Sequence, residues 1–592
     1  MRHREELWVM ARLSYDTRMQ LRRREFLAAS LAAPALAASR PNVIIVLTDD
    51  QGYGDLGCHG NPVLKTPNMD RLHAESIRFT DFHSAPMCTP TRGQLMSGQD
   101  ALRNKATSVT AGRAVLRRDL PTMADVFKSS GYRTALFGKW HLGDAYPYRP
   151  MDRGFEVAKY HLGWGLSSAP EFDNDYFNGR YRDQGVVKQF KGYCADFWFD
   201  EAMSWMRNQK EPFFCYLPTN TPHAPAWVAD KYSAPYKQPG VPAAFFGMIA
   251  NLDENLGRLE EFLQKSGLRE NTIVVFMTDN GGTAGAKFYN AGMRAAKTQI
   301  YDGGHRVPCF VRWPAGQLRP AGDVVTPAQM QDWLPTLIDL CSLKKPAKAK
   351  FDGASLRPAL RGGELVDRMM VVQYGQIPKM WDSNVIWGRW RLVKGTELYD
   401  FRADAGETTD LAAKEPAVVA RMRAHYERWW AGVSPGLPEP CPLSIGAPQE
   451  NPVTLTSSDW WEIYADNFGH VSTAAGGPTG GEWHVFVERS GEYEILLSRW
   501  PLEQKLALTA GREPKKMTAG ILQAGKALPI AGAKLKIAGR EQSVKTAVAD
   551  QVASFRVSLV GGTKTQLHGW FQDAKGADLC GVFYASVKWL RA

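Results

Sequence analysis

Four uninterrupted apolar runs, each ending abruptly in polar side chains, constrain the fold of this chain most strongly. They cover residues 42–48, 134–137, 213–217 and 272–277. Such runs are typical of strands that are buried on both faces of a parallel sheet. Helix-like stretches alternate with them, at residues 68–77, 121–129, 195–206 and 242–264. This alternation predicts an α/β fold with a large mixed, mostly parallel sheet sandwiched by helices.

Two further regions follow the large α/β domain, which we expect to span residues 41–344. A chain of 592 residues exceeds what one hydrophobic core normally organises. Residues 345–435 predict a small α+β subdomain, with short strands at 386–393 and 397–400 and a helix at 415–430. A Pro/Gly-rich linker is expected at 432–452. Residues 453–592 predict a β-sandwich-like domain, with strand patterns at 483–487, 493–497, 552–559 and 581–590.

The N-terminal segment, residues 1–40, has the pattern of a targeting signal. Arg22 and Arg23 stand shortly before Phe26 and Leu27, and an Ala-rich stretch follows. This order resembles a twin-arginine export signal, with Met19 as an alternative start of translation. No apolar run approaches the roughly 20 residues that span a bilayer. We therefore expect a periplasmic or secreted bacterial protein without a membrane span.

Charge and cysteine content exclude several classes of protein. The formal net charge is +11, yet beyond the N-terminus no Lys/Arg run resembles a nucleic-acid patch, so we expect no nucleic-acid partner. An anionic polysaccharide fits this charge. None of the eight cysteines forms a Cys-x-x-Cys pair, which argues against zinc ribbons and thioredoxin-like sites. Cys215 and Cys309 are expected in the core, and the even number permits disulfides.

The residues directly behind the first and last apolar runs form a set of hard oxygen donors. Asp49 and Asp50 follow the first run, and Asp279 and Asn280 follow the last. Ligands of open α/β sheets bind at the carboxyl ends of the strands. Carboxylate and amide oxygens suit Ca²⁺ or Mg²⁺ better than Zn²⁺. The two pairs together predict one divalent-cation site.

Four basic side chains extend this site: Lys139, His141, His223 and Lys297. The first two follow the second apolar run, and His223 follows the third. Side chains of this kind can surround an anionic ester with hydrogen-bond donors and proton carriers.

Cys88 opens a Cys-x-Pro-x-Arg pattern with Pro90 and Arg92. Pro90 suits the first turn of a helix, which places Cys88 at a helix N-terminus, where free N–H groups favour anions. A cysteine in that position, with an arginine one turn on, also fits a reactive thiolate. The motif by itself does not decide between these two interpretations.

Taken together, the motifs resemble those of the type I, formylglycine-dependent sulfatases of the alkaline phosphatase superfamily. The resemblance covers nearly all of residues 40–430. Besides the Cys88 motif it rests on Gly138-Lys-Trp-His-Leu-Gly143, Thr221-Pro-His-Ala-Pro225, Thr278-Asp-Asn-Gly-Gly282, Lys297 with Asp302-Gly-Gly-His-Arg-Val-Pro308, and Leu398-Tyr-Asp400 with Leu411. The family usually has Ser or Ala after the cysteine and Ser before the arginine, where this chain has Thr89 and Thr91. The Cys-x-Pro-x-Arg skeleton that the maturation enzyme reads is intact.

The resemblance implies that a formylglycine-generating enzyme oxidises Cys88 to formylglycine. The aldehyde hydrates to a diol, of which one hydroxyl attacks sulfur and the other later expels sulfate. The expected reaction is hydrolysis of a sulfate ester on a sulfated poly- or oligosaccharide. The expected metal is Ca²⁺, with Mg²⁺ as the alternative. Its implied ligands are Asp49, Asp50, Asp279, Asn280 and the residue at position 88.

The resemblance also implies roles for the other polar residues. Arg92 would hold the diol and support the metal carboxylates. Lys139 and Lys297 would neutralise the sulfate oxygens. His141 would act as the base that releases sulfate, and His223 would assist the leaving oxygen together with Lys297.

Other residues near these motifs have less defined roles. His305 and Arg306 either shape the pocket or pin a turn. Several aromatic residues could stack on sugar rings, although aromatic side chains more often anchor cores and loops. They are Trp140, Trp164, Tyr176, Trp227 and Tyr289.

Two other functions remain open at this point. A phosphonate monoester or phosphodiester hydrolase can share the Cys-x-Pro-x-Arg nucleophile. A non-catalytic protein that binds sulfated glycans is the second alternative, against which the complete catalytic set argues. A two-metal phosphatase is disfavoured because no additional His/Asp cluster is evident.

Overall fold

The computed structural model describes residues 40–347 and 349–591. The export signal predicted for residues 1–40 therefore lies, except for its last residue, outside the described residues. Within the described part of the chain, no helix combines the length and the apolar character that crossing a bilayer requires.

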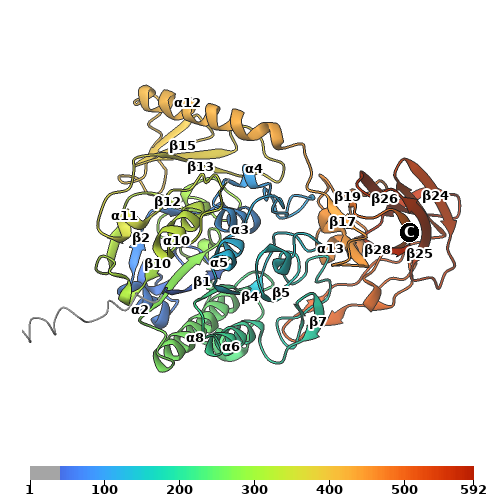
Figure 1. Ribbon diagram of the computed structural model, residues 1–592, viewed down its shortest axis with the longest axis horizontal. Helices are drawn as coiled ribbons and strands as arrows, with labels where there is room; N and C mark the ends of the chain where they lie inside the picture. The colour runs from blue at the N-terminus through green and yellow to red at the C-terminus, as the bar shows by residue number, and fades with distance from the viewer. Residues whose placement is uncertain (1–39, 348, 592) are drawn as a thin grey trace, which may run out of the picture. The chain divides into compact units, whose positions relative to one another are not determined.

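A ten-stranded mixed sheet forms the centre of the large α/β part (Figure 1). Its strand order is β11-β2-β10-β9-β1-β8-β4-β5-β6-β7. The strands from β9 to β5 in this order are parallel, whereas β10 is antiparallel to both of its neighbours, and β6 and β7 pair in antiparallel fashion. The mixed, mostly parallel sheet predicted from the sequence is confirmed. The strands are β1 (Asn42–Thr48), β2 (Ile77–Phe79), β4 (Arg133–Lys139), β5 (Val157–His161), β6 (Arg180–Asp183), β7 (Val186–Gln189), β8 (Phe213–Pro218), β9 (Thr272–Thr278), β10 (Cys309–Arg312) and β11 (Gly322–Val324).

Helices cover both faces of this sheet (Figure 1). In β1, Val43 and Ile45 belong to one apolar core, and Ile44 and Val46 belong to the core on the opposite face. The first core contains side chains of α3 (Cys88–Ser97), α5 (Met123–Ser129) and α10 (Trp333–Cys341). The second contains side chains of α2 (Pro67–Glu75), α6 (Cys194–Arg207) and α8 (Ala243–Lys265). The apolar runs are continuous because each strand buries both of its faces.

Short elements complete the large α/β part. They are β3 (Phe82–His83), β12 (Ala328–Gln329), α4 (Ala101–Asn104), α7 (Asp230–Ser233), α9 (Asp302–His305) and α11 (Arg357–Leu360).

A four-stranded antiparallel sheet with one long helix follows. It consists of β13 (Met369–Gln373), β14 (Ser383–Trp387), β15 (Trp390–Val393) and β16 (Glu397–Asp400), and it is covered by α12 (Pro416–Val433). The run at 386–393, expected as one strand, forms parts of two strands. Gly388, with a φ of 53°, lets the chain reverse between Trp387 and Trp390.

The C-terminal module, residues 443–591, consists mainly of two sheets around one apolar core, as expected for a β-sandwich-like region. One sheet has the order β17 (Leu443–Ile445), β19 (Glu482–Val487), β26 (Lys564–Gln572), β23 (Gly532–Ile537) and β24 (Arg540–Lys545), with β27 (Asp578–Gly581) beside β26. The other has the order β18 (Val453–Thr456), β28 (Tyr584–Arg591), β20 (Gly491–Ser498) and β25 (Ala553–Leu559). The helix α13 (Phe468–Thr473) and the hairpin of β21 (Lys515–Lys516) and β22 (Ile521–Leu522) lie between these strands in sequence. β17 falls within the segment expected as a linker.

The core of the C-terminal module extends into the large α/β part. Val115, Tyr148 and Phe172 belong to the same apolar cluster as the module's strands. The ring of Phe172 lies 4.6 Å from that of Phe468 and 5.7 Å from that of Trp500. The module is therefore packed directly against the sheet-bearing part of the chain.

All eight cysteines lie within the described residues, and each is a free thiol. Cys215 in β8 and Cys309 in β10 are buried, as predicted.

Candidate active site

The carboxyl ends of β1 and β9 bring the four predicted metal-binding side chains together. The two strands are parallel neighbours, followed by Asp49 and Asp50 in one case and by Asp279 and Asn280 in the other. The amide of Asp50 donates to Asp279 Oδ1 at 3.2 Å, and Asn280 Nδ2 donates to Asp50 Oδ1 at 3.0 Å. All four residues are buried. Asp50 has a φ of 67°, which residues with a side chain rarely adopt, and such backbone strain is typical of functional sites.

Cys88 is the first residue of α3, as the position of Pro90 predicted. Its sulfur lies within 4.8 Å of carboxylate oxygens of Asp49 and Asp50. Burial raises the pKa of the Cys88 thiol to about 11, although Lys139 and Lys297 act to lower it. A thiol with this pKa is not a reactive thiolate at neutral pH. The environment therefore disfavours the interpretation of Cys88 as an ordinary cysteine nucleophile.

Arg92 projects from the next turn of α3 and is fully buried. Its Nε and Nη2 donate to Asp279 Oδ2 at 3.2 and 2.8 Å, and its Nη1 donates to the carbonyl of Lys139 at 2.9 Å. The guanidinium thus connects the start of α3 to the ends of β9 and β4.

Two lysines supply positive charge to the same centre. Lys139, the last residue of β4, donates from Nζ to Asp49 Oδ2 at 2.7 Å. Lys297 donates to Asp50 Oδ1. A Cβ at Gly138, which has a φ of 132°, would lie 1.8 Å from the carbonyl oxygen of Pro218. Only glycine therefore lets β4 approach β8 closely enough to place Lys139 here.

The two predicted histidines lie beside these lysines. His141 is buried at a φ of 57°. Burial, Lys139 and Arg92 hold its pKa well below the usual range, so the ring is neutral and able to accept a proton. His223 Nε2 lies 3.8 Å from Asp50 Oδ2, and its Nδ1 is 2.7 Å from the carbonyl of Ala224.

The residues at the ends of β1 and β9 fit a hard divalent cation. Asp49 Oδ1 and Asn280 Oδ1 are buried and accept no hydrogen bond from any described residue. Burial and the neighbouring Asp279 raise the pKa of Asp49 to about 8, because the local positive charge does not offset three carboxylates. Against burial, which acts to raise it, Lys297 and His223 hold the pKa of Asp50 below its usual range. A cation bound by these oxygens would occupy the free acceptors and balance the charge.

A cavity of about 410 Å³ opens at Cys88. This volume is within the range of about 300–1,000 Å³ that is usual for small-molecule sites. His223 and Lys297 line the cavity together with Cys88. The other lining residues are Met87, Val109, Trp164, Ser167, Tyr464, Asp466, Asn467, Phe468 and Gly469.

Sequence reasoning missed most of this lining. Of the five aromatic residues considered for sugar stacking, Trp164 lines the cavity, with its ring 5.3 Å from that of His223. Trp140 and Tyr176 are fully buried. No local pattern singles out such residues, because they reach the cavity only through tertiary contacts.

His305 and Arg306 pin a turn rather than line this cavity. His305 Nδ1 lies 2.9 Å from His83 Nδ1. Arg306 donates to the carbonyl of Thr80 and lies over the ring of Tyr53 at 4.4 Å.

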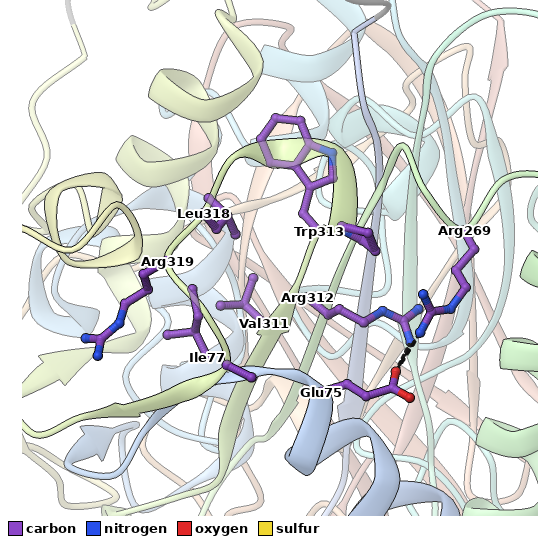
Figure 2. Close-up of a pocket in the computed structure, with 10 residues that line it drawn as sticks. Glu75, Ile77, Arg269, Val311, Arg312, Trp313, Leu318 and Arg319 are labelled. Atoms are coloured by element: carbon purple, nitrogen blue, oxygen red, sulfur yellow. Dashed lines mark hydrogen bonds and ion pairs between the residues drawn. The ribbon is translucent and has the colours of Figure 1, made fainter.

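A separate cavity of about 360 Å³ lies between the end of α2 and the end of β10 (Figure 2). Glu75 pairs there with Arg269 at 2.6 Å and with Arg312 at 3.3 Å. None of the predicted site residues lines it. The predicted site residues therefore lie around Cys88 and not at this cavity.

Comparisons with known proteins agree with this geometry. The chain is 29% identical over 421 residues to N-acetylgalactosamine-6-sulfatase of Canis lupus familiaris, which covers 64% of this chain and 79% of that protein. It is 30% identical over 379 residues to arylsulfatase A of Homo sapiens, with 59% of this chain and 73% of that protein covered.

Solved structures share the fold. The crystal structure of Ps i-CgsB in complex with k-i-k-neocarrahexaose aligns with a TM-score of 0.61 and 26% identity, over 66% of this chain and 93% of that one. The phosphonate monoester hydrolase of Agrobacterium radiobacter aligns with a TM-score of 0.51 and 21% identity, over 67% of this chain and 96% of that one. The second likeness shows the fold alone.

A family model described as Sulfatase matches residues 41–343, just over half of the chain. The match includes the ends of β1 and β9, the start of α3 and both lysines that pair with the carboxylates. From this match and the geometry of the site, we conclude that the chain belongs to the sulfatase family and is a sulfuric ester hydrolase.

Proposed function

We propose that this hydrolase removes sulfate from a sulfated poly- or oligosaccharide, with the residue at position 88 as its nucleophile. The observation that carries this proposal is the position of the Cys88 side chain. Its sulfur lies at a helix start, within 4.8 Å of oxygens of Asp49 and Asp50, in a cavity that also exposes His223 and Lys297. An anionic ester that enters the cavity meets cationic side chains next to that nucleophile.

The site fits two groups that we propose to complete it. A formylglycine at position 88, formed from Cys88 by a maturation enzyme, would supply in hydrated form a nucleophilic hydroxyl and a second hydroxyl for sulfate release. A Ca²⁺ ion, or Mg²⁺ in its place, would be held by Asp49, Asp50, Asp279, Asn280 and residue 88, and would supply the charge that acidifies a hydroxyl.

The chain's own residues then have defined tasks. Arg92 fixes Asp279 and the start of α3, which orients residue 88. Lys139 and Lys297 point their ammonium groups at the centre and neutralise the sulfate oxygens. His141, whose ring is neutral because burial, Lys139 and Arg92 lower its pKa, accepts the proton that leaves when sulfate is expelled. His223, together with Lys297, assists the departure of the leaving oxygen.

The substrate class follows from the cavity and from similar proteins. The cavity combines cationic groups with Trp164 and Tyr464, so it can hold a sulfate and an apolar ring face at the same time. The name of the mammalian relatives specifies an N-acetylgalactosamine substrate, and Ps i-CgsB was crystallised with an oligosaccharide. A sulfated carbohydrate fits these observations better than a small aryl sulfate.

We also propose the division of the chain that the sequence suggested. It consists of an export signal at 1–40 for the periplasm or the medium, a catalytic domain at 41–344, a subdomain at 345–435 and a β-rich accessory domain at 453–592. Mass spectrometry of protein from the culture supernatant or periplasm would test the signal, since cleavage should remove most of residues 1–40.

The catalytic proposal is tested by measuring sulfate release. The protein is co-expressed with a formylglycine-generating enzyme and incubated with a panel of sulfated glycans and with a phosphodiester. We expect sulfate release by the parent chain, a loss of at least about a thousandfold in Cys88→Ala, and no comparable loss in Cys441→Ala, a cysteine outside the cavity lining. Mass spectrometry should detect the aldehyde at position 88.

Two results would contradict the proposal. Cleavage of the phosphodiester without sulfate release would identify the protein as a phosphodiester or phosphonate monoester hydrolase. Equal activity of Cys88→Ala and the parent chain would remove residue 88 from the reaction.

A further inference from the structure

The cavity at Cys88 has one wall from the large α/β part and one wall from the C-terminal module. The second wall is the wall segment, defined as residues 464–469, of which Tyr464, Asp466, Asn467, Phe468 and Gly469 line the cavity. This segment lies far from the sulfatase match at 41–343 in the sequence. The catalytic domain therefore does not complete its own cavity.

The wall segment is hydrogen-bonded to the large α/β part. The amide of Phe468 donates to the carbonyl of Ser167, and the amide of Ala169 donates to the carbonyl of Asp466, both at 2.7 Å. Ser168 and Asn467 form an antiparallel bridge between these two bonds. The side chain of Phe468 continues into the shared apolar core, so the wall does not depend on a flexible tether.

Among the described residues that line this cavity, Asp466 is the one with an acidic side chain, and it is only 2% exposed. Its carboxylate lies near Trp164 and Thr110, which act to lower its pKa, whereas burial raises that pKa to about 6. Its Oδ1 lies 3.5 Å from Asn467 Nδ2 and 3.8 Å from His470 Nδ1. At neutral pH the group is mostly ionised, so it can act only as a hydrogen-bond acceptor, and a sugar hydroxyl would join or replace the donors around it.

The two walls present different charged side chains to the cavity. On the Cys88 side, Lys297 lines the cavity as a cation that is paired with Asp50. Asp466 makes the wall segment anionic, beside the half-exposed ring of Tyr464 and the ring of Trp164. A carboxylate beside aromatic rings is suited to a sugar, because the rings cover its apolar face and the carboxylate accepts hydroxyl protons. A second anion at this wall would be repelled.

We propose that the wall segment of the C-terminal module is a sugar-binding subsite that determines substrate specificity. Asp466 accepts a hydrogen bond from a hydroxyl of the ring that carries the reacting sulfate. It disfavours a ring with a second sulfate next to the first. This inference rests on the proposed function, because it assumes that the reacting sulfate lies at Cys88 and the lysines.

Binding to the Cys88→Ala chain tests the subsite without turnover. The probes are N-acetylgalactosamine 6-sulfate and the same sugar with a second sulfate on the neighbouring hydroxyl, titrated by calorimetry. We expect the monosulfate to bind at least about tenfold more tightly than the disulfate, because the disulfate places a negative charge beside Asp466. Adding Asp466→Asn should reduce this ratio to below about threefold.

A matched control and a second variant complete the experiment. Glu541→Gln removes one negative charge from an exposed position in β24 of the same module, and it should leave the ratio unchanged. Tyr464→Ala keeps the buried carboxylate and should weaken binding of both sugars by about tenfold through loss of ring contact. Thermal unfolding of each variant shows that it is folded.

Several outcomes would overturn the subsite. The first is the same ratio of monosulfate to disulfate affinity in the Asp466→Asn and Glu541→Gln chains. The second is an affinity of Tyr464→Ala for both sugars equal to that of the parent. The third is that the parent Cys88→Ala chain binds neither sugar or shows no preference between them. The failure of the proposed function looks different. In that case the mature enzyme releases no sulfate from either sugar, while the Cys88→Ala chain still prefers the monosulfate and loses this preference with Asp466→Asn.

Discussion

At the scale of single residues, the site brings together charged side chains whose burial is energetically unfavourable. Asp49, Asp50 and Asp279 lie at two adjacent strand ends, and Arg92, Lys139 and Lys297 are paired with them. Buried ion pairs of this kind rarely add net stability, because desolvation offsets their attraction. The chemistry proposed at residue 88 accounts for this arrangement, and the strained backbone at Asp50 and His141 is consistent with it.

Cation binding should therefore stabilise the folded chain. We expect added Ca²⁺ to raise the free energy of unfolding by about 2.7 kcal/mol at a hundred times its Kd, because the folded state alone assembles the oxygen ligands. Urea unfolding with and without Ca²⁺ measures this increment, and Mg²⁺ is tested in parallel.

The variant Asp50→Asn identifies the site of this effect. It removes one charged ligand, so the increment from Ca²⁺ should fall by at least half, whereas Glu541→Gln should keep it. The same increment in Asp50→Asn as in the parent chain would place the cation elsewhere.

At the scale of elements, a buried arginine of the four-stranded sheet region forms two ion pairs with the large α/β part. Arg391 of β15 donates from Nε to Asp302 Oδ1 at 2.9 Å and from Nη2 to Asp81 Oδ1 at 2.6 Å. Asp81 also pairs with His83, which contacts His305. This network fixes α9, which follows the segment that carries Lys297.

We expect Arg391→Met to lower the free energy of unfolding by about 3–5 kcal/mol, because Asp81 and Asp302 would remain buried without their cation. Arg421→Met is the matched control in the same region. Arg421 is exposed, and its guanidinium lies 4.0 Å from the centre of the Trp387 ring. Its replacement should therefore lower the free energy of unfolding by about 1 kcal/mol or less. Equal losses in urea unfolding would argue against the network.

The same network has a predictable pH dependence. Against burial, which acts to raise them, Arg391 and His83 hold the pKa values of Asp81 and Asp302 below their usual range. The stabilisation is therefore fully present above pH about 4, the usual carboxyl range in unfolded chains, and declines as the pH falls towards the folded pKa values. The stability difference between the parent chain and Arg391→Met should shrink in that range.

The elements that the sequence predicted best are those with the most uniform burial. β1 and β9 bury both faces, so their apolar runs are continuous and end where the polar site residues begin. The hairpin of β14 and β15 was less evident, because a single glycine separates two short strands with similar composition. The strand ends could therefore be read from the sequence, whereas the turn between two similar strands could not.

The cavity wall was not predictable for a different reason. Asp466 and Tyr464 reach the site through a two-stranded contact between residues 167–169 and 466–468, which lie about half of the chain length apart. No periodicity or motif in one segment specifies such pairing.

At the scale of the whole described chain, the apolar core of the C-terminal module includes side chains of the large α/β part. Phe172 is 2% exposed and contacts Phe468 and Trp500. Lys515 pairs with the adjacent Asp173 at 2.6 Å. A common core should make the two parts unfold together.

Phe172→Ala tests this coupling. We expect the substitution to lower the free energy of unfolding by about 3–5 kcal/mol, because it creates a cavity between the C-terminal module and the large α/β part. The single calorimetric transition should then split into two. Phe245→Ala is the matched control, since Phe245 of α8 is 3% exposed in a core that the module does not enter. Phe245→Ala should lower the temperature of the calorimetric transition without splitting the transition into two. A split in both variants, or in neither, would contradict the coupling.

The bridge between residues 167–169 and 466–468 has a consequence for how substrate range can change in such a chain. A different C-terminal domain cannot simply replace the present module. To complete the cavity, one of its loops would have to pair with residues 167–169, close to Trp164. Recombination that exchanges one partner of the bridge alone would leave an open and unselective cleft. Changes of sugar preference should therefore arise by paired substitutions in these two loops, or by transfer of both loops as a unit.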